Sequence, residues 1–168
     1  MSDDFIDSVR QHASSEQKQE KESAKYIEGR RTWWIEEVDK LFNDIRTWLD
    51  PLIQDGTIKF ETTDIGITEE MLGSYTIREA VIRLANKELR LRPIGSMIFG
   101  SYGRVDLIGP TGQAMIVLEA DKAQAESSYR PITLKWHIVK KEGLQRSTLD
   151  FNEASFKALF SDLFGIVR

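Results

Sequence analysis

The sequence contains no cysteine, only two histidines and only four prolines. The absence of cysteine excludes disulfides, thiolate nucleophiles and metal sites built on cysteine. The two histidines, His12 and His137, do not stand in a metal-ligand spacing such as HExxH. Gly-Lys-Ser/Thr phosphate loops and GxSxG nucleophile elbows are also missing. We therefore expect no metal, no cofactor and no catalytic residue, and a small enzyme is the weakest of the functional hypotheses.

Long hydrophobic runs are missing as well. The longest clean apolar stretch covers residues 114–118, whereas a membrane-spanning helix needs about 20 such residues. The N-terminus is acidic and lacks the apolar core of a secretory signal. These features predict a soluble, cytoplasmic protein with no membrane partner.

What the chain does contain is enough apolar surface for one packed domain. It has 168 residues, of which 40% are hydrophobic and 30% charged, with a formal net charge of −4. The charge is uneven: residues 1–56 carry −5, whereas residues 78–104 carry +4. A local basic region can bind anions even when the whole chain is acidic.

The N-terminal segment, residues 1–27, is predicted to be a polar helical or flexible segment outside a single α+β domain at 28–168. Residues 13–25 contain no large apolar side chain, so they cannot offset the entropy of ordering by burial alone. Phe5, Ile6 and Val9 precede this polar stretch. They fit either a frayed terminus or a docking segment at the end of a tether.

Two helices are predicted with strong apolar faces. In residues 30–54, apolar side chains recur with the i, i+3, i+4, i+7 spacing of an amphipathic helix. Pro51 should kink or restart this helix, and Gly56 should end it. The second helix, 152–164, is expected to begin at an Asn152 cap and to stop at Gly165.

Between the helices, the hydrophobic period changes to two. Residues 57–62 are predicted to be the first strand and 63–75 a loop, with room for a short turn at 68–72. Residues 76–92 fit either a helix with a capping box or a hairpin with an Asn86-Lys87 turn, and we favour the hairpin. That turn would place Leu84 opposite Leu89 and Arg83 opposite Arg90.

The remaining residues are predicted to continue as a meander. We expect a strand over 95–108 with a bulge at the glycine-rich residues 100–103, a central strand at 114–118, a polar loop at 121–130, and two further strands at 132–138 and 144–151. The predicted fold is therefore an antiparallel meander of six to seven strands packed against the helices 30–54 and 152–164. The helices should share one face, with the N-terminal segment or a partner covering the other.

Surplus tryptophan suggests where a partner could bind. Trp33, Trp34 and Trp48 lie on one helix, and tryptophan is enriched at the hot spots of protein interfaces. The alternative is an ordinary wide buried face, because aromatic side chains also dominate cores. We take these residues, with the N-terminal segment, as the predicted interface of a non-enzymatic protein-protein interaction module, such as an adaptor, an inhibitor, an immunity-type protein, an assembly subunit or a self-associating dimer.

The basic region gives an alternative function, the binding of nucleic acid or of a phosphate-containing ligand. Its predicted residues are Arg83, Arg90, Arg92 and Arg104, with Tyr102 as a stacking group. An opposed pair of arginines would need acids or a bound anion. The competing interpretation is a solvated sheet face on which Glu79 and Glu88 neutralise the arginines and Arg104 pairs with Asp106.

Overall fold

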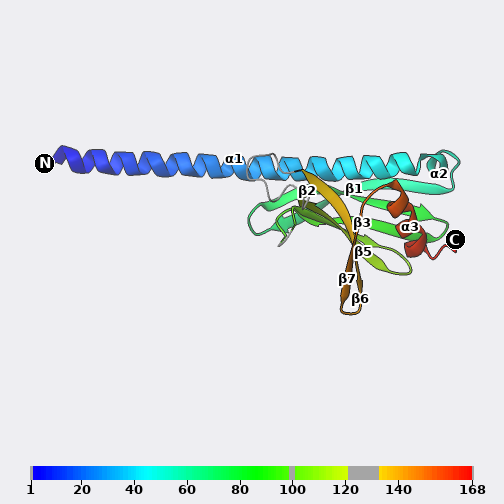
Figure 1. Cartoon of the computed structure of the whole chain (residues 1–168). Helices are drawn as coiled ribbons and strands as arrows, with labels where there is room; N and C mark the ends of the chain where they lie inside the picture. Colours follow the sequence, from blue (N-terminus) through cyan, green and yellow to red (C-terminus); the bar gives the residue numbers. More distant parts are fainter. Residues whose placement is uncertain (1, 99–100, 121–132, 168) are drawn as a thin grey trace.

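The computed structural model describes residues 2–98, 101–120 and 133–167 (Figure 1). It begins with a helix of 47 residues, α1 (Ser2–Trp48), followed by the short helix α2 (Asp50–Gln54). A sheet of seven strands comes next, and the helix α3 (Glu153–Phe164) completes the fold. The polar loop predicted at 121–130 lies outside the described residues.

The sheet is an antiparallel meander in which every strand pairs with the next one along the chain. This arrangement confirms the predicted α+β class, and the sheet is not closed into a barrel. The strands are β1 (Ile58–Glu69), β2 (Gly73–Leu84), β3 (Lys87–Gly95), β4 (Gly103–Ile108), β5 (Gln113–Ala120), β6 (Leu134–Glu142) and β7 (Gln145–Asp150).

The second half of α1 and the whole of α3 pack into one hydrophobic core with the sheet. Trp34, Leu41 and Ile45 of α1 are almost completely buried there, as is Phe156 of α3. The Trp48 and Phe156 rings, whose centroids are 5.8 Å apart, join the two helices directly. The two helices therefore cover the same side of the core, as the sequence predicted.

The first helix begins at Ser2 rather than at the predicted residue 30, but its predicted C-terminal end and both predicted ends of α3 are confirmed. The helical path breaks after Trp48 and restarts as α2, with Pro51 in the first turn, where its missing N–H costs nothing. Gly56 follows with a φ of 79°, in the left-handed region that favours glycine. In α3, the Asn152 side chain accepts a hydrogen bond from the backbone N–H of Ser155, and Gly165 has a φ of 71°.

The loop predicted at 63–75 is wrong. The strand β1 continues to Glu69 and β2 begins at Gly73, so the two strands form one long ribbon. In this ribbon Ile65 pairs with Ile77 and Ile67 with Tyr75, and all four side chains pack against the core. The polar threonines and glycine between the apolar residues conceal the period of two that these strands follow.

The hairpin at 76–92 is confirmed, but its predicted turn is one residue too late. The two-residue turn is Ala85-Asn86, and Ala85 takes the positive φ, 54°. Leu84 therefore pairs with Lys87, and Arg83 pairs with Glu88 rather than with Arg90. Moving the turn by one residue shifts the pairing by two residues, and side chains alternate between faces with a period of two. The apolar residues therefore stay on the core side, while the charged residues acquire new partners.

Two further expectations need correction. Residues 95–108 do not form one interrupted strand: β3 ends at Gly95 and β4 starts at Gly103 as its antiparallel neighbour. Gly103 lies against the Trp34 ring, so closely that a Cβ atom there would overlap the indole. The N-terminal segment does not cover the second face of the sheet, because it projects away from the body as the free half of α1 (Figure 1).

Candidate protein interface

The first half of α1 is a helix without a tertiary partner in this chain. Residues 3–26 are all exposed, and at a rise of about 1.5 Å per residue they form a rod about 36 Å long. Its middle is rich in Glu, Lys, Gln and Ala, which are strong helix formers. Asp3 and Asp4 lie in the first turn, where the helix dipole favours negative charge. We call residues 3–26 the free half of α1.

Large apolar side chains are exposed at the far end of the rod. The exposed fractions are 72% for Phe5, 43% for Ile6 and 51% for Val9. These three residues lie within two turns, and together they form a small apolar patch on a helix that is otherwise polar. We call them the apolar tip.

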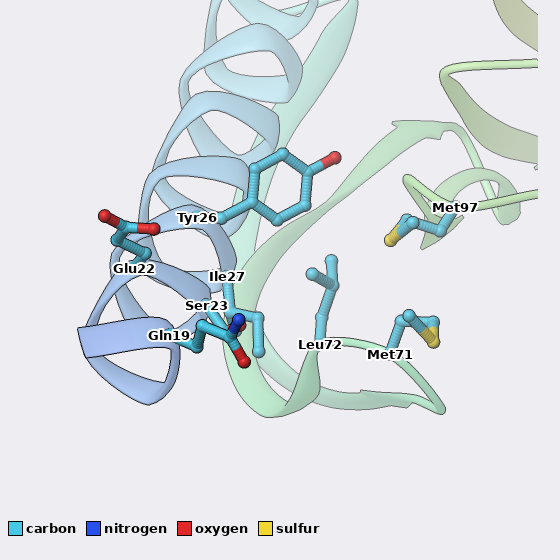
Figure 2. A pocket seen from close by; sticks show the side chains of 8 residues that line it. All are labelled: Gln19, Glu22, Ser23, Tyr26, Ile27, Met71, Leu72 and Met97. Atoms are coloured by element: carbon cyan, nitrogen blue, oxygen red, sulfur yellow. The ribbon is translucent and has the colours of Figure 1, made fainter. Parts of the chain in front are cut away.

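At its near end, the free half of α1 meets the body in a groove of about 480 Å³ (Figure 2). Tyr26 and Ile27 of α1 form one side, and Met97 and the turn between β1 and β2 form the other. Met71 in that turn is 65% exposed and Met97 is 41% exposed, whereas Leu72 is buried. Flexible methionines adapt to partners of different shape, and they are common at binding surfaces. We call this site the base groove.

Glu69 fixes one wall of the base groove. Its Oε1 atom accepts hydrogen bonds from the backbone N–H groups of Ser96 and Met97, at 2.8 and 2.9 Å. Its Oε2 atom accepts a hydrogen bond from the Tyr75 hydroxyl. Burial, together with this carboxylate neighbour, raises the pKa of the Tyr75 phenol well above its ordinary value. The phenol therefore stays protonated and remains a donor, which holds β1, β2 and the segment after β3 together.

Arg30 fixes the other wall. Its guanidinium donates hydrogen bonds to the carbonyl oxygens of Ser96 and Tyr102, at 2.8 and 3.2 Å. It also lies 4.5 Å from the Trp33 ring centroid and 5.5 Å from that of Tyr102. Both backbone polar groups of Ser96 are therefore hydrogen-bonded to side chains: its N–H donates to Glu69, and its C=O accepts from Arg30. The base groove is consequently pre-formed, which lowers the entropy that a ligand must lose on binding.

The structure places the three predicted interface tryptophans in different surroundings. Trp34 is completely buried and belongs to the core, so its ring is not available to a partner in this fold. Trp33 and Trp48 are partly buried and pack against the core. Trp33 stacks under Arg30, close to the base groove, whereas Trp48 contacts Phe151 and Phe156 at the other end of the helix.

Most arginines of the predicted anion-binding region have acidic neighbours. Arg83 lies 3.3 Å from Glu88, Arg90 is paired with the buried carboxylate of Glu79, and Arg104 donates to Asp106 at 2.7 Å. The ion pair expected between Arg104 and Asp106 is therefore present. Arg92 is exposed and stands opposite Asp106 in the ladder. Tyr102 lies beside Arg30 rather than beside these arginines.

The residues of the base groove were not found from the sequence. The short turn predicted at 68–72 overlaps the turn that presents Met71 and Leu72, but the erroneous loop around it hid the pairing that brings Tyr75 to Glu69. One signal was available: Met71 and Leu72 are adjacent apolar residues in an otherwise polar stretch. By contrast, Phe5, Ile6 and Val9 stand out in the sequence, where they fit either a frayed terminus or a docking segment.

Comparison of the chain with protein families, with curated proteins and with solved structures gives no match. Within the described residues, no helix combines the length and the apolar content needed to cross a membrane. The same part of the chain holds no cluster of three or more His, Asp or Glu side chains suited to a metal ion. The function is therefore argued from the geometry of this chain alone.

Proposed function

We propose that this protein is a non-enzymatic protein-protein interaction module, and that it binds through the free half of α1 and the base groove. The observation that carries the proposal is the exposure of residues 3–26 along a helix that starts with an apolar tip and ends at a pre-formed apolar groove. This surface replaces the tryptophan-centred interface that the sequence suggested, because Trp34 is inside the core.

The composition of the rod supports a binding role. A helix that is polar on all sides needs many internal ion pairs or a partner to be stable by itself. Residues 3–26 contain the ion pair Asp7–Arg10, at 3.9 Å, and a contact between His12 and Glu16, at 3.1 Å. Pairs of this exposed kind contribute only a few tenths of a kcal/mol each. Contact with a partner would supply the stabilisation that the exposed rod does not obtain from its own body.

The alternative function, anion or nucleic-acid binding, has weaker support. Arg83, Arg90 and Arg104 already have carboxylate neighbours within 3.3 Å or less. An incoming phosphate would have to compete with those carboxylates, and binding would therefore be weak and strongly dependent on salt.

The proposed function can be tested by site-specific photo-crosslinking in the producing cell. A photoreactive residue is placed at Ile6 in the apolar tip, at Met97 in the base groove, or at Gln11 as a control on the opposite side of the helix. We expect discrete crosslinked products from the first two positions, and few from Gln11. If Ile6 and Met97 give no more product than Gln11, the surface is not an interface and the proposed function is wrong.

A further inference from the structure

The first 31 residues of the chain, which comprise the free half of α1 and the turn by which it joins the body, have a charge gradient from one end to the other. Residues 2–9 contain Asp3, Asp4 and Asp7 and carry −3, whereas residues 10–24 are neutral overall. Residues 25–31 contain Lys25, Arg30 and Arg31 against Glu28, and they carry +2. Two such helices side by side would repel at both ends if they were parallel, and they would attract at both ends if they were antiparallel.

The apolar groups follow the same arrangement. The apolar tip occupies the acidic end of the rod, and the base groove lies beside the basic end. Arg30 lies next to the base groove without lining it, and its charge is met by carbonyl oxygens, with no carboxylate of the described residues in an ion pair with it. Glu22 is the one charged side chain that lines the base groove, so the positive charge that favours an acidic helix end comes from Lys25, Arg30 and Arg31 around it. This chain itself carries such an acidic, apolar helix end.

Helical spacing places both features on one side of α1. Phe5, Val9, Glu16, Ser23 and Ile27 are separated by four, seven, seven and four residues, so they share one face. Seven residues after Ile27, the same face reaches Trp34, which packs into the core. A second helix on this face would therefore lie on the body side of α1, and its end would meet the base groove.

We infer that this chain forms a symmetric dimer in which the free halves of α1 lie antiparallel, and the apolar tip of each chain occupies the base groove of the other. The inference rests on the proposed function and names its partner as a second copy. Placing Phe5 opposite Ile27 of the second copy also places Val9 opposite Ser23, with the two-fold axis at Glu16. Such an isologous interface makes each end contact twice, so one surface satisfies both chains.

The first test is the solution mass of the purified full chain by light scattering. We expect twice the chain mass of 19.3 kDa. The variant Phe5→Asp should be monomeric at the same concentration, because it places a charge in the apolar contact. Gln11→Asp changes the charge equally on the opposite side of the helix, and it should remain dimeric. A wild-type protein that is monomeric at its highest monodisperse concentration overturns the inference.

The base groove is tested separately with Met97→Asp, a change on the body rather than on α1. Since Met97 is exposed, this variant should keep its fold, which circular dichroism can verify. We expect its dimer to dissociate at least tenfold more readily than that of the wild type. Dissociation unchanged from the wild type would show that the tip does not occupy the groove.

The orientation is tested by disulfide crosslinking, because the chain has no cysteine of its own. Glu16→Cys should form a covalent dimer under mild oxidation, since this position lies at the two-fold axis. Val9→Cys alone should not crosslink, but a mixture of Val9→Cys with Ser23→Cys should. Efficient crosslinking of Val9→Cys with itself would indicate parallel helices and contradict the inferred arrangement.

The two proposals fail in different ways. A monomeric purified protein whose Ile6 and Met97 positions crosslink in the cell to a protein of another mass would leave the proposed function standing and remove the second copy as partner. A monomeric protein without those crosslinks would remove both.

Discussion

Glu69 shows how a single side chain organises the base groove. Its carboxylate accepts hydrogen bonds from two backbone N–H groups and from the Tyr75 hydroxyl. Bonds to a charged acceptor are stronger than neutral ones, and Ser96, which supplies one of the donors, is completely buried. Loss of the carboxylate would leave those donors unpaired.

We therefore predict that Glu69→Ala lowers the free energy of unfolding by about 2–3 kcal/mol, the cost of buried donors left without their charged acceptor. Urea unfolding followed by tryptophan fluorescence measures this change. The neighbouring Glu70 is exposed, and Glu70→Ala should change the stability by less than about 0.5 kcal/mol. Equal effects of the two substitutions would contradict the role assigned to Glu69.

The raised pKa of Tyr75 predicts that the free energy of unfolding decreases at alkaline pH. Because the folded state raises the pKa of this phenol, the unfolded chain loses the proton first as the pH rises. The stabilisation is complete below the unfolded pKa of about 10, and it declines as the pH increases towards the folded value. The free energy of unfolding should therefore fall above about pH 10.

The control for this prediction is Tyr75→Phe, which removes the titrating group. It should be less stable than the wild type at neutral pH by about 1 kcal/mol, because one hydrogen bond is lost. Above about pH 10 its stability should decline less steeply than that of the wild type. Parallel stability curves for the two proteins would show that Tyr75 is not the group responsible.

At the scale of elements, α3 shows which local signals are sufficient. The Asn152 cap, the apolar spacing and the Gly165 stop were all read from the sequence, and all are present. These signals act within one or two helical turns, so they do not depend on the rest of the fold. The burial of Phe156, Phe160 and Phe164 then follows from the apolar face.

We predict that Phe160→Ala destabilises the protein by about 3–5 kcal/mol, the usual cost of truncating a buried aromatic side chain. Phe160 is 7% exposed, and its ring packs at a tilt against that of Phe164, with a centroid distance of 4.7 Å. Leu144, in the turn between β6 and β7, is fully exposed, and Leu144→Ala provides a control with little expected effect. A loss below about 1 kcal/mol for Phe160→Ala would mean that α3 is peripheral to the core.

The β1–β2 ribbon shows where local signals fail. Its outer half was predicted to be a loop, because threonine and glycine separate Ile65 and Ile67 from other apolar residues. The pairing of Ile65 with Ile77 and the packing of both against the core stabilise strands that their own sequence specifies weakly. The position of the Ala85-Asn86 turn was missed for a related reason, since both registers keep Ile82 and Leu89 on the core side.

At the scale of the whole molecule, the protein combines a packed body with a rod that lies outside it (Figure 1). Residues 3–26 are exposed and do not belong to the hydrophobic core. The free energy that holds the body together therefore comes from residues beyond the rod.

We predict that deletion of residues 1–25 leaves a body that still unfolds cooperatively. Its circular dichroism spectrum should lose helical signal but keep the contribution of the strands. Its urea midpoint should be close to that of the wild type at high dilution. At higher concentration the intact chain alone should gain stability, because association stabilises the folded state by mass action. Urea unfolding of both proteins at several concentrations measures both effects. Global unfolding of the truncated chain would show that the rod contributes to the fold.

The sequence by itself determined the features that depend on neighbouring residues: both ends of α3, the end of the first helix near Gly56, the apolar faces of the helices and most of the antiparallel meander. It left open whether residues 1–27 are helical or flexible. Only the tertiary structure decided that Trp34 is internal, that the arginines meet carboxylates, and that a groove lies at the base of α1. The physical reason is that these contacts join residues that are far apart in the sequence. Glu69 grips a backbone N–H 27 residues away, and Arg30 binds carbonyls 66 and 72 residues away. Such contacts arise from the packing of whole elements, and no local pattern specifies them.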